Sequence, residues 1–121
     1  MKTKDVKINE WPQSWQGVKS DILYGQEIIK YMIPFIEEMK RKQLSIKTIN
    51  KHIDNLWVLG GKIIKELNDY EENRELPALK MMLNCIDSNE GPLIHDFPQL
   101  QQNEFDSTCR KFYKFLKKRK K

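Results

Sequence analysis

The sequence has few of the features that mark secreted or membrane proteins. Its two cysteines, Cys85 and Cys109, are far apart, so a disulfide framework is not indicated and a reducing cytoplasm is the expected location. Residues 1–10 include no apolar stretch of signal-peptide length. No run approaches the roughly 20 apolar residues that span a bilayer. These absences predict a cytoplasmic protein that does not contact membranes.

The sequence also lacks the residue patterns of common active sites. The two histidines and two cysteines do not have the spacing of zinc ligands. Gly60 and Gly61 lie inside a predicted helix, where a close helix crossing or a bend would explain them, whereas a phosphate-binding glycine loop follows a strand. Cys109 is expected to be a core thiol, and His52 either a surface histidine beside charged residues or a group that supports its neighbours. We predict no catalytic residue, metal, cofactor or small-molecule substrate.

The chain does have an uneven distribution of charge. Its net charge is +5, and residues 110–121 carry eight basic residues and no acidic one. The rest of the chain holds 14 basic and 17 acidic residues, a net charge of −3. A basic end on a mildly acidic body favours a polyanionic partner. The alternative is an end that keeps the chain soluble and complements the dipole at a helix C-terminus.

Length and composition predict one domain. The chain has 121 residues, of which 39% are hydrophobic and 32% charged, a globular balance that buries roughly two-thirds of the unfolded surface. We expect an irregular N-terminal arm at residues 1–20, a single helical domain at 21–118 and a basic tail at 119–121. Trp11 and Trp15 are costly to leave in water, so the arm is expected to pack on the body.

Apolar residues at helical spacing predict two long helices in the first half. One extends from about Asp21 to Lys42, and Pro34 should kink or break it near Tyr31 because proline removes a backbone donor. The second extends from Ile46 to about Asn68 and is capped by Ser45. Its predicted apolar face consists of Ile46, Ile49, Ile53, Trp57, Gly60, Ile64 and Leu67.

The second half predicts two further helices. One covers about Leu76 to Ile86, and residues 93–102 are expected to be irregular. Asn103 should cap the last helix. The apolar face of that helix is predicted to consist of Phe105, Cys109, Phe112 and Leu116. The fold class that follows is all-α, a compact orthogonal bundle of four to five helices.

Two of these helices carry basic residues on the side away from their apolar faces. In the helix from residue 46 these are Lys47, Lys51, Lys62 and Lys65, and in the last helix they are Arg110, Lys111, Lys114, Lys117 and Lys118. Lysine and arginine contacts to phosphates supply most of the affinity of nucleic-acid binding, and a helix fits the major groove. The basic helices therefore favour duplex DNA as a partner.

Two motifs connect this pattern to a known family. The segment Leu44-Ser45-Ile46-Lys47-Thr48-Ile49 opens the second helix, and the last helix carries Phe112-Tyr113-Lys114-Phe115-Leu116. Together with the order of the helices over about residues 22–118, these motifs resemble the core-binding, SAM-like domain of tyrosine recombinases and phage integrases. The segments 52–61 and 105–111 also resemble parts of small stand-alone bacterial proteins.

The resemblance implies a helical domain that grips duplex DNA with its second and fourth helices near the major groove. When the DNA-contact positions of the family are carried over to this sequence, they fall on residues most of which the charge pattern also selects. With the remaining lysines of the last helix, the predicted DNA contacts are Lys47, Thr48, Lys51, Arg110, Lys111, Lys114, Lys117 and Lys118. The His-x-x-Arg segment and the terminal tyrosine nucleophile of the recombinases are absent from these residues, so strand cleavage is not expected.

Two functions are favoured at the level of sequence, and a third, an enzyme of an unrecognised kind, would need a deep polar pocket in the structure. The first is a non-catalytic DNA-binding domain, such as an accessory protein of a mobile element. The second is a protein-interaction or regulatory module that binds no nucleic acid, which the mildly acidic body and the pair Trp11 and Trp15 would suit. A continuous positive surface across the two basic helices would favour DNA binding, and acidic side chains interleaved between those helices would remove that hypothesis.

Overall fold

The computed structural model describes residues 8–119, and all regular secondary structure within that range is helical. The elements in chain order are the 3₁₀ helix η1 (Ile8–Glu10), α1 (Trp11–Trp15), α2 (Asp21–Arg41), α3 (Ile46–Asp69), the 3₁₀ helix η2 (Glu71–Glu75), α4 (Ala78–Cys85) and α5 (Gln99–Arg119). The predicted all-α class is confirmed. No helix within this range is long and apolar enough to cross a membrane.

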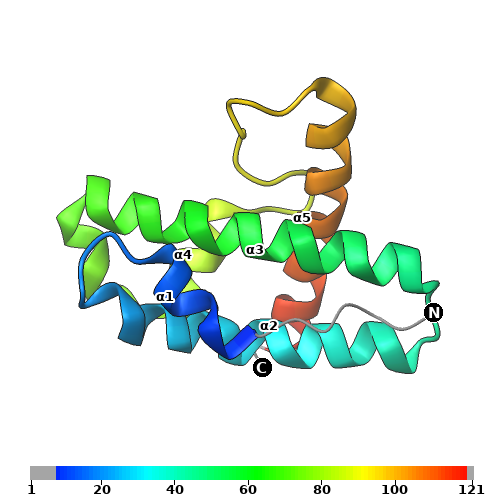
Figure 1. Cartoon of the computed structure of the whole chain (residues 1–121), viewed down its shortest axis with the longest axis horizontal. Helices are drawn as coiled ribbons and strands as arrows, with labels where there is room; N and C mark the ends of the chain where they lie inside the picture. The colour runs from blue at the N-terminus through cyan, green and yellow to red at the C-terminus, as the bar shows by residue number, and fades with distance from the viewer. Residues whose placement is uncertain (1–7, 120–121) are drawn as a thin grey trace.

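The helices α2 and α3 lie side by side and antiparallel, and form the long axis of the molecule (Figure 1). A short turn joins them, in which Gln43 has a positive φ of 60°. Ser45 caps α3 as predicted, because its hydroxyl accepts a hydrogen bond of 3.1 Å from the backbone N–H of Thr48. Pro34 does not break α2, which remains one helix of 21 residues.

The helix α5 crosses α3 steeply, and its first turns extend beyond the body together with the loop at residues 86–98 (Figure 1). Its predicted apolar face is confirmed, since Phe105, Cys109 and Phe112 are fully buried and Leu116 is nearly so. Its predicted start is wrong. The helix begins at Gln99, and Asn103 lies inside it instead of capping it.

The apolar face predicted for α3 is wrong at one position. Trp57 is 44% exposed, whereas Leu56, Leu59 and Ile63 are fully buried. The difference arises because α3 packs against α1 and α2 as well as α5, so its buried surface is wider than one stripe. The helix is therefore the central element of the fold.

Part of the predicted irregular arm is helical. Residues 11–15 form α1, and Trp11 and Trp15 are buried against the body, while residues 1–7 lie outside the described range. The Trp15 indole N–H donates to the Trp57 carbonyl at 2.9 Å. A Cβ atom at Gly60 would lie only 2.1 Å from the Trp15 ring. The glycine thus makes room for an indole ring, where the sequence suggested a helix crossing or a bend.

Candidate nucleic-acid interface

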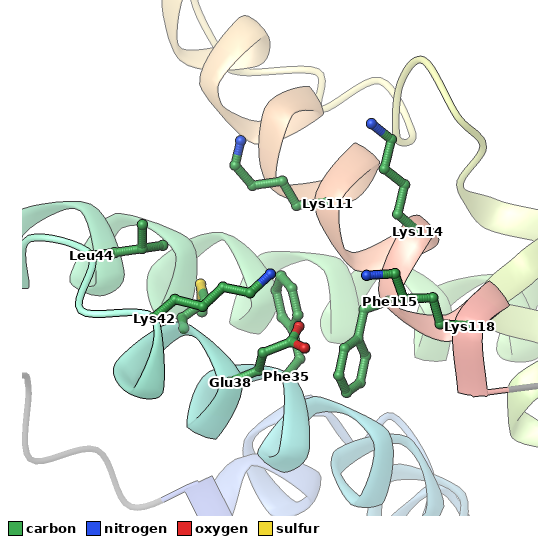
Figure 2. A pocket seen from close by; sticks show the side chains of 9 residues that line it. Phe35, Glu38, Lys42, Leu44, Lys111, Lys114, Phe115 and Lys118 are labelled. Carbon is green, nitrogen blue, oxygen red and sulfur yellow. The ribbon is translucent and has the colours of Figure 1, made fainter.

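The packing of α5 determines which of its side chains face outward. The four buried residues of its apolar face hold the helix against the core, so Lys111, Lys114 and Lys118 project on an exposed side. Their spacing of three and four residues places them along one stripe of the helix. In Figure 2 this stripe lies across from the C-terminal end of α2. The fold therefore brings a row of lysines to the junction of two helices.

A pocket of about 280 Å³ lies between α2 and α5. Its lining residues are Phe35, Glu38, Met39, Lys42, Leu44, Lys111, Lys114, Phe115 and Lys118. The rings of Phe35 and Phe115, with centroids 5.3 Å apart, lie at the base of the pocket (Figure 2). The lining combines four lysines and one glutamate with a mostly apolar base, so its net charge is positive.

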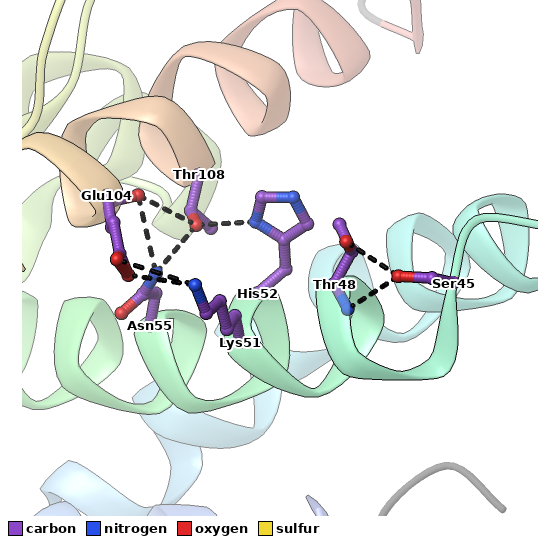
Figure 3. A network of polar contacts seen from close by, with 7 residues as sticks. All are labelled: Ser45, Thr48, Lys51, His52, Asn55, Glu104 and Thr108. Atoms are coloured by element: carbon purple, nitrogen blue, oxygen red, sulfur yellow. Dashed lines mark hydrogen bonds and ion pairs between the residues drawn. The ribbon is translucent and has the colours of Figure 1, made fainter. Parts of the chain in front are cut away.

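A second pocket of about 260 Å³ lies where α3 meets α5 (Figure 3). Thr48, Lys51, His52 and Asn55 line it from α3, and Glu104, Ser107 and Lys111 line it from α5. Two of the three DNA contacts predicted on α3, Thr48 and Lys51, thus come close to Lys111. Because Lys111 lines both pockets, it connects this junction to the lysine stripe of α5.

An acidic side chain lies at this junction. The Nζ atom of Lys51 is 3.4 Å from a carboxylate oxygen of Glu104 (Figure 3). The ion pair compensates one of the charges predicted to contact DNA. An acidic group therefore lies between the basic residues of α3 and those of α5. Along α5 itself, no acidic residue follows Asp106.

A cluster of polar side chains at the base of this junction contains His52. Its ring is only 6% exposed, and its Nδ1 atom lies 2.6 Å from the Thr108 hydroxyl (Figure 3). Of the two roles expected for His52, the surface position is wrong, because α5 crosses α3 at this point and covers the ring. Burial lowers the pKa of His52, and the nearby charges of Lys111 and Lys51 lower it further. The ring is neutral at physiological pH and acts as a buried structural group.

The other predicted contacts do not gather at one place. Lys47 is exposed in the first turn of α3 and lines neither pocket. Arg110 donates a hydrogen bond of 3.1 Å to the Asn89 carbonyl of the preceding loop. The Nζ atom of Lys117 lies 5.9 Å from the ring centroid of Tyr113. That pair lies in a shallow surface pocket with Lys114 and Lys118, so it extends the basic stripe of α5.

Sequence reasoning missed Lys42, which completes the basic lining from α2. The signal was the run Lys40-Arg41-Lys42 at the end of that helix, but which helix it would face depends on the fold. Lys40 and Arg41 each lie 3.9 Å from a glutamate of the same helix. No carboxylate of the described residues lies within 4.0 Å of Lys42, so its charge is uncompensated.

The cysteines are placed for packing. Burial raises the pKa of the Cys85 thiol to about 11 and raises that of Cys109 as well, so both thiols stay protonated and are weak nucleophiles. Within the described part of the chain, no three or more His, Cys, Asp or Glu side chains are grouped so that they could hold a metal ion. The surface chemistry that stands out is therefore the basic stripe of α5.

No protein-family model matches the chain, and no solved structure matches it significantly. The resemblance to recombinase core-binding domains consequently rests on the two sequence motifs and the order of the helices, and it stays a prediction.

Proposed function

We propose that this protein binds duplex DNA through α5 without catalysing a reaction on it. The observation that carries the proposal is the row of exposed lysines Lys111, Lys114, Lys117 and Lys118, together with Lys42 from α2, on a surface with few acidic groups. These ammonium groups would neutralise backbone phosphates and release condensed counterions. The apolar face of α5 is held in the core, so binding needs no refolding of the helix.

The contribution of α3 to the proposed interface is smaller than the sequence suggested. Lys51 is paired with Glu104, and Thr48 accepts a hydrogen bond of 2.8 Å from the Ser45 hydroxyl. Both would have to exchange these partners for phosphate oxygens. We therefore assign most of the affinity to α5 and Lys42, and a supporting role to the first turns of α3. The recombinase resemblance implies contacts from both helices, so it supports the role of α5 but would give α3 a larger part than its ion pair allows.

The protein-interaction alternative loses one of its two supports. It rested on the mildly acidic body and on Trp11 and Trp15, and both rings are buried in the core. Trp15 is further held by its hydrogen bond to α3. A partner could reach these rings only by displacing α1. Glu104 between α3 and α5 counts against a DNA surface across both helices, so the DNA proposal is confined to α5 and Lys42.

A titration of the protein with labelled duplex DNA, followed by fluorescence anisotropy at two salt concentrations, tests the proposal. We expect binding at low salt that weakens as salt rises. The triple variant K111Q/K114Q/K118Q should reduce the slope of log affinity against log salt by about 0.9 for each lysine that contacts a phosphate. The control K19Q/K62Q/K80Q removes the same charge from exposed or half-buried lysines elsewhere. Equal effects of the two triples, or no binding at low salt, would refute the proposal.

A further inference from the structure

The pocket between α2 and α5 contains apolar residues that contacts to DNA phosphates do not require. Its base is formed by Phe35, Met39 and Phe115, each less than a tenth exposed. Leu44, from the turn before α3, adds an apolar wall that is 37% exposed. Phosphate contacts need only cations at the surface. An apolar base beneath lysines is suited to a ligand that has both an apolar part and a charge.

The charge of the lining selects an anion. Four of the lining side chains are lysines, and no carboxylate of the described residues lies within 4.0 Å of their ammonium groups. Several other exposed lysines, such as Lys30 and Lys65, do pair with an acid. The one acid of the lining, Glu38, has Arg41 at 3.9 Å. The lining therefore holds an excess of positive charge that its own residues do not compensate.

The side chains around the pocket are placed to contact the charged part and the apolar part of such a ligand at the same time. In Figure 2, the side chains of Lys42 and Lys118 extend from opposite helices toward the space above the two phenylalanine rings. Lys111 and Lys114 lie along the rim. Lysine has a long flexible stem, so the rim ammonium groups can turn toward an anion seated there. An aromatic or aliphatic group on the base would then lie directly below a ring of donors.

The size of the pocket limits the ligand. Its volume of about 280 Å³ lies just below the roughly 300–1,000 Å³ that is typical of ligand sites. It can hold one ring or a short hydrocarbon segment with its anionic group, but not a large cofactor.

We propose that this pocket is a binding site for a small amphipathic anion, a phosphate or carboxylate carried on an aromatic or aliphatic group. The anionic end is held by Lys42, Lys114 and Lys118, and the apolar end packs on Phe35, Met39 and Leu44. The proposal does not rest on DNA binding, and its test contains no DNA, so either proposal can fail without the other. It also goes beyond the sequence, which predicted no small-molecule ligand.

Phenyl phosphate is a suitable probe because its two halves are available separately as inorganic phosphate and phenol. Each of the three compounds is titrated into the full chain at physiological salt, and the methyl NMR signals of Met39 and Leu44 are followed. We expect saturable shifts with phenyl phosphate. Each half should bind more weakly by roughly tenfold or more, because it loses either the charge-assisted hydrogen bonds or the apolar contact.

Two variants separate the parts of the site. Leu44→Ala, at a partly exposed position, should weaken phenyl phosphate and leave inorganic phosphate unchanged. The double variant K114Q/K118Q should weaken phenyl phosphate by roughly tenfold, while the control K62Q/K80Q should not. The absence of saturable shifts, equal affinity for inorganic phosphate and phenyl phosphate, or equal effects of the two double variants would overturn the proposal.

Discussion

The Nδ1 atom of His52 on α3 lies 2.6 Å from the hydroxyl oxygen of Thr108 on α5. The amide of Asn55 donates to the same hydroxyl oxygen at 2.9 Å. The one proton of the Thr108 hydroxyl can go to His52 or to the Glu104 carbonyl, which is 3.4 Å away, so which partner donates between His52 and Thr108 depends on the tautomer of the ring. The ring is buried where the charges of Lys111 and Lys51 also disfavour a proton, so this contact between the two helices is made by a neutral histidine.

The first prediction concerns pH. The pKa of His52 is about 6.5 in the unfolded chain and is lower in the folded protein. The unfolded state thus binds the proton more readily. The stability that the neutral His52 contributes is therefore fully present above about pH 6.5 and is lost as the pH decreases toward the folded-state pKa. Urea unfolding at several pH values between these limits measures the effect.

The variant His52→Gln provides the comparison, because glutamine can accept the same hydrogen bond and does not titrate. The difference in stability between the wild type and this variant should shrink as the pH falls, while His95→Gln, at an exposed position, should leave the pH profile of the wild type unchanged. A wild type and a His52→Gln variant with parallel pH profiles would show that the histidine is not held neutral by the fold.

The second prediction concerns the contact of Trp15 with Gly60. Replacing a glycine inside a helix with alanine should by itself stabilise the folded protein by about 1 kcal/mol. At Gly60 the new Cβ would meet the Trp15 ring at 2.1 Å, whereas at Gly61 it would lie 3.4 Å away, an ordinary contact. We expect Gly60→Ala to destabilise by about 1 to 3 kcal/mol from overpacking, and Gly61→Ala to be neutral or stabilising.

Thermal unfolding of both single variants measures this contrast. Combining Gly60→Ala with Trp15→Leu removes the ring that causes the clash, so the double variant should lose less stability than the two single changes added together. Strict additivity would mean that the alanine is accommodated without involving the ring.

Much of the fold follows from the periodicity of the sequence, and the parts that do not are those made by tertiary contact. The end of α2, the Ser45 cap of α3 and the buried face of α5 were all predicted, because each depends on residues three or four apart. The five residues of α1 were not. A helix that short is marginal in isolation, and it exists here because Trp11 and Trp15 are buried between α2 and α3.

The candidate site was predictable along one helix and unpredictable between helices. The outward position of Lys111, Lys114 and Lys118 follows from the apolar residues that lie opposite them. Lys42 could not be assigned to the same surface, since it is more than 60 residues away in sequence. The ion pair between Lys51 and Glu104 could not be predicted for the same reason, because it depends on where α5 crosses α3.

The third prediction concerns Asp21, a fully buried carboxylate. One oxygen accepts from the backbone N–H groups of Gly17 and Val18 at 2.7 and 2.9 Å and from Asn68 at 3.0 Å, and the other lies 2.8 Å from the guanidinium of Arg74. Burial raises the pKa of Asp21, but these hydrogen bonds outweigh it and the net pKa is lowered. The carboxylate therefore connects the α1–α2 turn, α3 and η2.

Replacing Asp21 with alanine should destabilise the protein by about 3 kcal/mol, because it leaves donors without partners and Arg74 without its counter-ion. The matched control is Asp69→Ala, which removes an exposed ion pair of 2.8 Å with Lys65 and should cost much less, because solvent screens the pair. Because the folded pKa is depressed, the stability from Asp21 is present above about pH 4 and is lost as the pH falls through the folded-state pKa. Equal costs for the two variants in urea unfolding would contradict this account.

The last prediction asks whether α3 belongs to the DNA interface. Glu104→Gln removes the carboxylate that pairs with Lys51 and makes the positive surface continuous from α3 to α5. If DNA lies across both helices, this variant should bind more tightly than the wild type, and the slope of log affinity against log salt should steepen by about 0.9 as Lys51 gains a phosphate contact. Glu27→Gln makes the same charge change at a pair with Lys30 on α2, and anisotropy titrations at two salt concentrations compare the two. Equal affinities for the two variants would confine the DNA to α5 and Lys42, because the freed lysine would then have no phosphate within reach.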